Sequence, residues 1–116
     1  MATVELTREN FETVVTENPI VLVDWWASWC GPCRMFGPVF ERASEGHGDI
    51  VFGKIDTDAQ QELAAGAQIR SIPTLMAFKE GNLVFSQAGA LGGPALEQVI
   101  AAVREFDVRA ALKEDK

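Results

Sequence analysis

Apolar residues follow two different periods along this chain, and four segments show the pattern of strands. The clearest is an apolar run over residues 20–26 that only Asp24 interrupts, which is typical of a strand buried on both faces of a sheet. The predicted strands are residues 20–26, 50–55, 74–79 and 83–87. The short turn between the last two predicts a hairpin.

Helical spacing of apolar residues predicts four helices. They are residues 8–16, a helix that runs from Cys33 to the glycines near 46, residues 59–67, and a last helix that begins at Pro94. Thr7 is expected to cap the first helix, and Pro38 to bend the second because proline has no N–H to donate. His47 lies between two glycines and is expected to be a solvated loop residue.

With a first strand near Val4, the predicted order of elements is βαβαβαββα. Repeated βα units predict parallel pairing, and the hairpin adds antiparallel strands. The expected fold class is therefore α/β, with a mixed central sheet and helices on both faces. A length of 116 residues fits a single domain over 1–116. We expect its core over about 4–106 and a polar tail over 107–116 that frays.

The charge balance narrows the possible partners. Ten Lys and Arg residues stand against 17 Asp and Glu, a net charge of −7, and no basic run is present. We therefore expect no nucleic-acid partner. No apolar stretch approaches the roughly 20 residues that cross a bilayer, and residues 1–15 carry charges where a signal peptide is apolar. We expect a cytoplasmic monomer without a membrane partner.

The two cysteines of the chain, Cys30 and Cys33, lie where a strand leads into a helix. Two cysteines are too few for a secreted disulfide framework, so their spacing favours redox chemistry. Cys30 is expected to be the attacking thiolate, because free N–H groups and the helix dipole stabilise an anion there. Cys33, one turn inside the helix, is expected to be more shielded and to resolve a mixed disulfide. Pro32 gives the sulfur neither a donor nor a charge, which favours a reductant over an oxidant.

A Cys-x-x-Cys pair also occurs as half of a zinc site, which needs four ligands. Besides the cysteines this chain offers only His47, so two chains would have to share the metal. No glycine-rich G-x-G-x-x-G segment is present to bind a dinucleotide. We therefore expect no metal and no cofactor, and electrons have to arrive from a partner protein.

The segment Trp29-Cys30-Gly31-Pro32-Cys33, followed about forty residues later by Ile72-Pro73-Thr74, resembles the thioredoxin family. The element order from Val4 to Phe106 agrees with that fold. The resemblance implies a thiol–disulfide oxidoreductase that reduces disulfides of client proteins. It further implies electron transport, a role in cell redox homeostasis and recharging by a thioredoxin reductase.

The resemblance also implies roles for individual residues. Asp24 matches a buried aspartate that would accept the proton of Cys33, although from the residues alone a structural aspartate is an equal alternative. Lys54 matches a lysine close to that aspartate, whereas its sequence context favours a side chain that reaches solvent. Pro73 matches a cis proline that faces the cysteines, and the backbone of Ile72 would pair with a substrate segment. The implied substrate-binding surface comprises Trp29, Gly31, Pro32, Ile72, Pro73, Gly89 and Ala90.

Two other functions stay open at this point. A specialised oxidant or isomerase of the same fold is opposed by the Gly31-Pro32 pair between the cysteines. A binding subunit whose thiols are not required is possible because a fold does not dictate function. Replacing Cys30 with serine separates the last alternative from a reductant.

Overall fold

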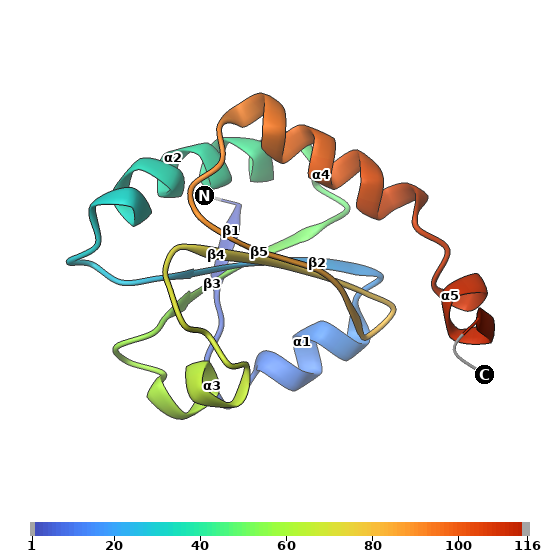
Figure 1. The fold of residues 1–116 in the computed structure, drawn as a ribbon, viewed down its shortest axis with the longest axis horizontal. Helices are drawn as coiled ribbons and strands as arrows, with labels where there is room; N and C mark the ends of the chain where they lie inside the picture. The colour runs from blue at the N-terminus through green and yellow to red at the C-terminus, as the bar shows by residue number, and fades with distance from the viewer. Residues whose placement is uncertain (1, 115–116) are drawn as a thin grey trace.

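The computed structural model describes residues 2–114. The strands are β1 (Thr3–Glu5), β2 (Ile20–Trp26), β3 (Val51–Asp56), β4 (Thr74–Lys79) and β5 (Asn82–Ala88). The helices are α1 (Phe11–Glu17), α2 (Gly31–Gly46), α3 (Gln61–Gly66), α4 (Gly93–Glu105) and α5 (Val108–Glu114). Figure 1 shows α2 and α4 on one face of the sheet and α1 and α3 on the other. The predicted α/β class with a mixed, doubly covered sheet is confirmed.

The sheet has the strand order β1-β3-β2-β4-β5, which places β2 in the centre. β3 pairs in parallel with β1 and β2, whereas β4 pairs antiparallel with β2 and β5. The central place of β2 explains its continuous apolar run, since both of its faces and both of its edges are covered. The register sets Asp24 beside Lys54 on β3 and Leu75 on β4.

Alternation along β2 divides the core between the two faces of the sheet. Ile20 and Leu22 pack with residues of α2 and α4, whereas Val21, Val23 and Trp25 pack in a second cluster with residues of α1 and α3. Because successive side chains of a strand point to opposite faces, Asp24 faces the same side as Leu22. The buried carboxyl therefore lies under α2, the helix that carries the cysteines.

The first helix begins three residues later than the sequence predicts. Thr7 does not cap it: the side-chain oxygen of Asn10 accepts a hydrogen bond from the Thr7 backbone N–H at 2.7 Å, and the helix starts at Phe11. Short polar side chains such as asparagine compete with the helix for backbone donors. The segment from Thr7 to Asn10 is therefore a turn.

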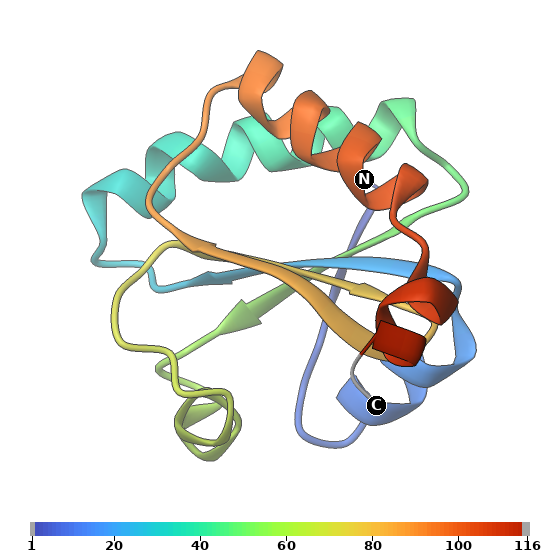
Figure 2. The ribbon, with the colours of Figure 1, turned by 45° about the vertical axis from the view of Figure 1, so that its right-hand side comes forward.

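The chain also contains a helix that the sequence did not predict. Residues Val108–Glu114 form α5, in which Val108 is buried and the Asp107 carboxylate accepts a hydrogen bond from the Ala110 N–H at 3.1 Å. Figure 2 shows the chain turning after α4 and passing the sheet before α5 forms. Most of the tail that is expected to fray thus lies in this helix, and residues 115–116 lie outside the described residues.

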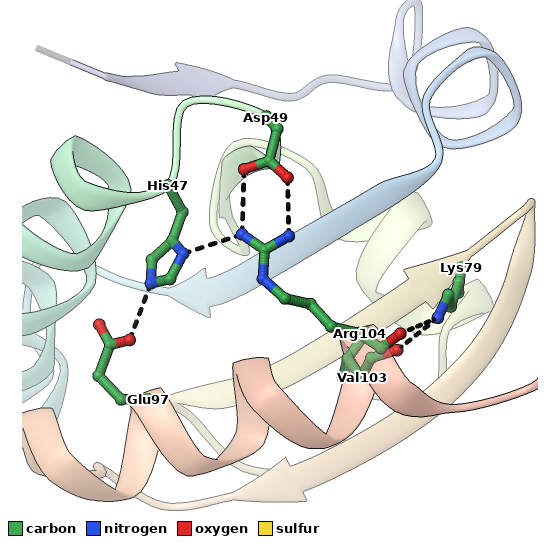
Figure 3. A network of polar contacts seen from close by, with 6 residues as sticks. All are labelled: His47, Asp49, Lys79, Glu97, Val103 and Arg104. Carbon is green, nitrogen blue, oxygen red and sulfur yellow. Dashed lines mark hydrogen bonds and ion pairs between the residues drawn. The ribbon is translucent and has the colours of Figure 1, made fainter.

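The turn after α4 is held by a lysine of β4. Lys79 Nζ donates hydrogen bonds to the carbonyl oxygens of Val103 and Arg104 at 2.8 and 2.7 Å (Figure 3). It donates a third to the carbonyl oxygen of Phe106 at 2.8 Å. Carbonyls in the last turn of a helix have no partner inside the helix, and a cation there also opposes the negative end of the dipole. Lys79 therefore fixes the end of α4 to the sheet.

His47 lies in the loop after α2, as its flanking glycines predict, but its ring is half-buried and paired instead of solvated. Its ring lies between Glu97 Oε1, 2.8 Å from Nε2, and Arg104 Nη2, 3.0 Å from Nδ1, as Figure 3 shows. Arg104 also donates two hydrogen bonds to Asp49 at 2.7 and 3.0 Å. Because a guanidinium only donates, Nδ1 accepts and Nε2 carries the proton. The network joins α4 to the end of α2.

Candidate functional site

The two cysteines lie at the amino end of α2. Cys30 is the residue before the helix, and its Sγ accepts a hydrogen bond from the Cys33 backbone N–H at 3.2 Å. The two residues form a disulfide, with Cα atoms 5.2 Å apart. Pro32 occupies the first turn, where its missing N–H costs no intrahelical bond. Local sequence alone thus places one sulfur against the positive end of the helix.

The two cysteines are equally covered in this oxidised form. Each is 4% exposed, so the prediction that Cys33 is more shielded than Cys30 is not met. Their surroundings still differ: Cys30 Sγ lies 3.6 Å from the carbonyl oxygen of Ile72, whereas Cys33 lines a cleft that it shares with Lys54.

A carboxyl group and an ammonium group lie behind the cysteines. Asp24 is fully buried, and within residues 2–114 neither of its oxygens has a hydrogen-bond donor. Burial raises its pKa from the ordinary 3.8 to about 7, against the opposing charge of Lys54. Lys54 Nζ lies 4.0 Å from Asp24 Oδ2 and 5.1 Å from the centroid of the Trp26 ring. At this distance the pair is an electrostatic contact and not a hydrogen bond.

The Ile72–Pro73 peptide bond is cis, and Pro73 is buried. The carbonyl oxygen of Pro73 accepts a hydrogen bond from the Gly89 N–H at 2.8 Å. Gly89 has φ of +105°, a backbone region that strongly favours glycine. This bond holds the segment at Gly89 and Ala90 against the cis proline, so the predicted substrate-binding segments do come together.

Trp29 is 67% exposed beside the cysteines, as predicted. Its Nε1 donates a hydrogen bond to Asp58 Oδ2 at 2.9 Å, a contact that the sequence did not reveal because Asp58 belongs to no motif. Met35 on α2 is exposed as well, at 73%. Gly31 and Ile72 are half-buried, whereas Pro32, Gly89 and Ala90 are exposed.

This arrangement supports one kind of chemistry. A sulfur at a helix amino terminus is stabilised as an anion, a second sulfur lies within bonding distance, and a buried carboxyl with a pKa of about 7 lies behind them. Such a pair can exchange two electrons with an external disulfide. Residues 2–114 contain no cluster of three or more His, Cys, Asp or Glu side chains placed to hold a metal ion. In the same range no helix is long and apolar enough to cross a membrane.

Comparison with known proteins defines the family. The thioredoxin family model matches residues 2–102, so the chain belongs to the thioredoxin family. It is therefore a thiol–disulfide oxidoreductase with the role of a protein-disulfide reductase.

Named relatives and solved structures agree with that assignment. A Streptomyces coelicolor chain designated a putative thioredoxin 2 is 54% identical over 118 aligned positions, which cover 99% of this chain and 88% of the relative. A Mycobacterium tuberculosis thioredoxin is 46% identical over 97 positions, which cover 82% of this chain and 84% of the relative. The solved structure of a mutant thioredoxin from Halobacterium salinarum has a TM-score of 0.81 at 34% identity, covering 90% of this chain and 92% of that one.

Proposed function

We propose that this protein reduces exposed disulfides of client proteins in two steps. The Cys30 thiolate attacks a client disulfide, which forms a mixed disulfide and releases one client sulfur as a thiolate. The Cys33 sulfur then attacks Cys30, gives its proton to the Asp24 carboxylate and expels the second client sulfur. The product is the Cys30–Cys33 disulfide together with two client thiols, so two electrons have passed to the client.

One arrangement carries this proposal. The Cys30 sulfur caps α2 and accepts a hydrogen bond from the Cys33 N–H, while Asp24 Oδ2 and Lys54 Nζ lie 4.0 Å apart beneath the same helix. The helix end stabilises the attacking thiolate, and the buried carboxyl has a pKa matched to proton exchange near neutral pH. Lys54 stabilises the ionised form of Asp24 and so keeps a fraction of it ready to accept a proton.

The exposed groups around the disulfide supply the client-binding surface. An extended client segment would pair with the backbone of Ile72, beside Cys30, and would cross the cis Pro73 and the small residues Gly89 and Ala90. Trp29, Gly31 and Pro32 would form the opposite, apolar side. A surface of this size fits brief encounters with many clients better than a permanent complex.

The oxidised protein has to be recharged, and we assign that step to a thioredoxin reductase. The chain has no segment that binds a flavin or a nicotinamide cofactor, so electrons arrive by a second disulfide exchange. A reductant of this kind acts where thiols are kept reduced, which favours the cytoplasm. We propose that it acts there as a monomer, because the disulfide site needs no second copy.

Insulin disulfide reduction, coupled to NADPH and thioredoxin reductase, tests the proposal. Wild-type protein should turn over repeatedly. Cys30→Ser should be inactive, and Cys33→Ser should accumulate a covalent mixed disulfide that mass spectrometry detects at Cys30. A binding subunit would instead retain its biological activity in Cys30→Ser, and inactivity of fully reduced wild-type protein would contradict the assignment.

A further inference from the structure

A cleft of about 390 Å³ lies between α2 and the sheet, behind the cysteines. Its lining residues are Trp26, Cys33, Arg34, Gly37, Pro38, Glu41 and Lys54. Cys33, Gly37 and Glu41 are spaced four apart and therefore share one face of the helix. The cleft thus connects the resolving cysteine with a carboxylate two turns further along α2.

Lys54 lies at the middle of this face. A Cβ atom built on Gly37 would have Lys54 Nζ as its nearest neighbour, at 3.5 Å. The ammonium group therefore lies under the helix at the level of Gly37, the middle of the three residues Cys33, Gly37 and Glu41 on this face. The same ammonium group is 4.0 Å from Asp24 Oδ2.

The two carboxylate oxygens of Glu41 differ in their surroundings, because one accepts a hydrogen bond and the other is buried without a donor. Its Oε2 accepts a hydrogen bond from Thr3 Oγ1 of β1 at 2.7 Å. Its Oε1 is buried, and no donor within residues 2–114 reaches it. A buried carboxylate oxygen without a donor is costly, and a cleft of this size has room for water that can supply one.

The unpartnered oxygens of the described chain gather at this place. Within residues 2–114, four buried side-chain N or O atoms lack a hydrogen-bond partner. Three of these four are the two Asp24 oxygens and Glu41 Oε1. All three belong to carboxyl groups that either contact Lys54 or line the cleft with it. Asp24 thus contacts Lys54 directly, and Glu41 lines the same cleft as Lys54 without an ion pair to it.

We propose that Glu41 is a positioning residue for proton transfer at Asp24, acting through Lys54 and the water of the cleft. The inference rests on the proposed function. When Cys33 attacks Cys30, the Cys33 proton passes to Asp24, and the client sulfur leaves with its electron pair. The proton then leaves Asp24 through cleft water, which Glu41 orders. Glu41 forms no covalent bond in this sequence of steps.

The direction of the effect follows from charge. Glu41 repels a second negative charge at Asp24 and attracts Lys54 away from it, and both actions disfavour ionised Asp24. Neutralising Glu41 should therefore lower the pKa of Asp24. The other charged groups on this side are Arg34, Glu5 on β1 in register with Lys54, and Asp56 at the end of β3. They remain unchanged in a Glu41 variant.

The test compares Glu41→Gln with Glu45→Gln, an exposed glutamate one turn further along α2. The pKa of Asp24 is measured by carboxyl ¹³C NMR in the reduced protein, together with the pH profile of mixed-disulfide resolution. We expect Glu41→Gln to lower the pKa of Asp24 by roughly half a unit and to shift the profile to lower pH by the same amount. Glu45→Gln should leave both unchanged.

Thr3→Val keeps the carboxylate but removes its anchor. Thr3→Val should shift the pH profile of mixed-disulfide resolution when it is made in the wild type. It should have no further effect when it is added to Glu41→Gln. A merely structural role of Thr3 would not produce this dependence on Glu41. An unchanged pKa of Asp24 in Glu41→Gln, or an equal shift in Glu45→Gln, overturns the inference. These outcomes are separate from failure of the proposed function, which would appear as wild-type protein that does not reduce insulin.

Discussion

Replacing Asp24 with asparagine removes an ionisable group from the centre of the sheet while nearly keeping its shape. The carboxyl is fully buried, and its pKa is raised from 3.8 to about 7 because burial disfavours the charge. Below about pH 4 the group is neutral in the folded and the unfolded chain. Between about pH 4 and 7 only the unfolded chain releases the proton, so the stability of the wild type falls as pH rises. Above about pH 7 Asp24 is ionised in the folded protein as well, and the stability of the wild type is lowered by the full cost of ionising this buried group.

The size of the effect follows from the difference between the two pKa values. One pKa unit corresponds to about 1.4 kcal/mol, so the cost of ionising Asp24 reaches roughly 4 kcal/mol at alkaline pH. Asparagine cannot ionise and does not carry that cost. We expect Asp24→Asn to match the wild type at about pH 4 and to be more stable by roughly 4 kcal/mol at about pH 8.5.

Urea unfolding of the oxidised proteins measures this, since disulfide-bonded cysteines do not titrate in that form. The difference in free energy of unfolding should rise by about 1.4 kcal/mol per pH unit between about pH 4 and 7 and then level off. Glu45→Gln, which removes an exposed carboxylate from α2, should show no such rise. A difference that does not depend on pH, or that falls with pH, would show that Asp24 is not a buried acid of raised pKa.

Two further predictions concern the scaffold of the site. Gly53→Ala should lower the free energy of unfolding by about 1–3 kcal/mol, because the new Cβ would lie 2.3 Å from Cδ1 of the buried Leu6. Gly46→Ala, with nothing within 4 Å, is its control in the same urea titration. Lys79→Met should cost about 1–3 kcal/mol, since three carbonyls at the end of α4 lose their donor. Lys113→Met, at an exposed position of α5, should change the urea midpoint little, and equal losses in both lysine variants would contradict the capping role.

Strands buried on both faces were the elements that the sequence predicted best. The bounds predicted for β2 and β4, residues 20–26 and 74–79, are those of the structure, because burial on both sides of a strand appears directly as an apolar run. The predicted start of α1 was wrong because Thr7 and Asn10 both have side chains that can cap a helix. Only the fold decides that the Asn10 side chain turns back to Thr7.

The missed features depend on residues far apart in the chain. The turn into α5 is fixed by Lys79, which binds carbonyls 24, 25 and 27 residues away. His47 is placed by Glu97 and Arg104, which lie 50 and 57 residues further along. No local sequence pattern predicts such pairs, so the sequence indicated a solvated side chain at His47 instead of a paired one.

The site divides in the same way. The redox pair, the buried carboxyl and the cis proline belong to motifs, and their residues could be named from the sequence. Asp58 and Glu41 belong to none, and their significance appears only when the fold sets them beside Trp29 and in the cleft with Lys54. The sequence also did not predict that the two cysteines are equally exposed in the disulfide-bonded protein.

The central claim is that the end of α2 stabilises a thiolate at Cys30 and not at Cys33. Alkylation of the reduced protein by iodoacetamide, followed over about pH 5 to 10 with the modified residue located by mass spectrometry, tests it most directly. We predict that Cys30 reacts first, with an apparent pKa clearly below the ordinary value of about 8.5. Equal and slow modification of both cysteines, each with an ordinary pKa, would contradict the account.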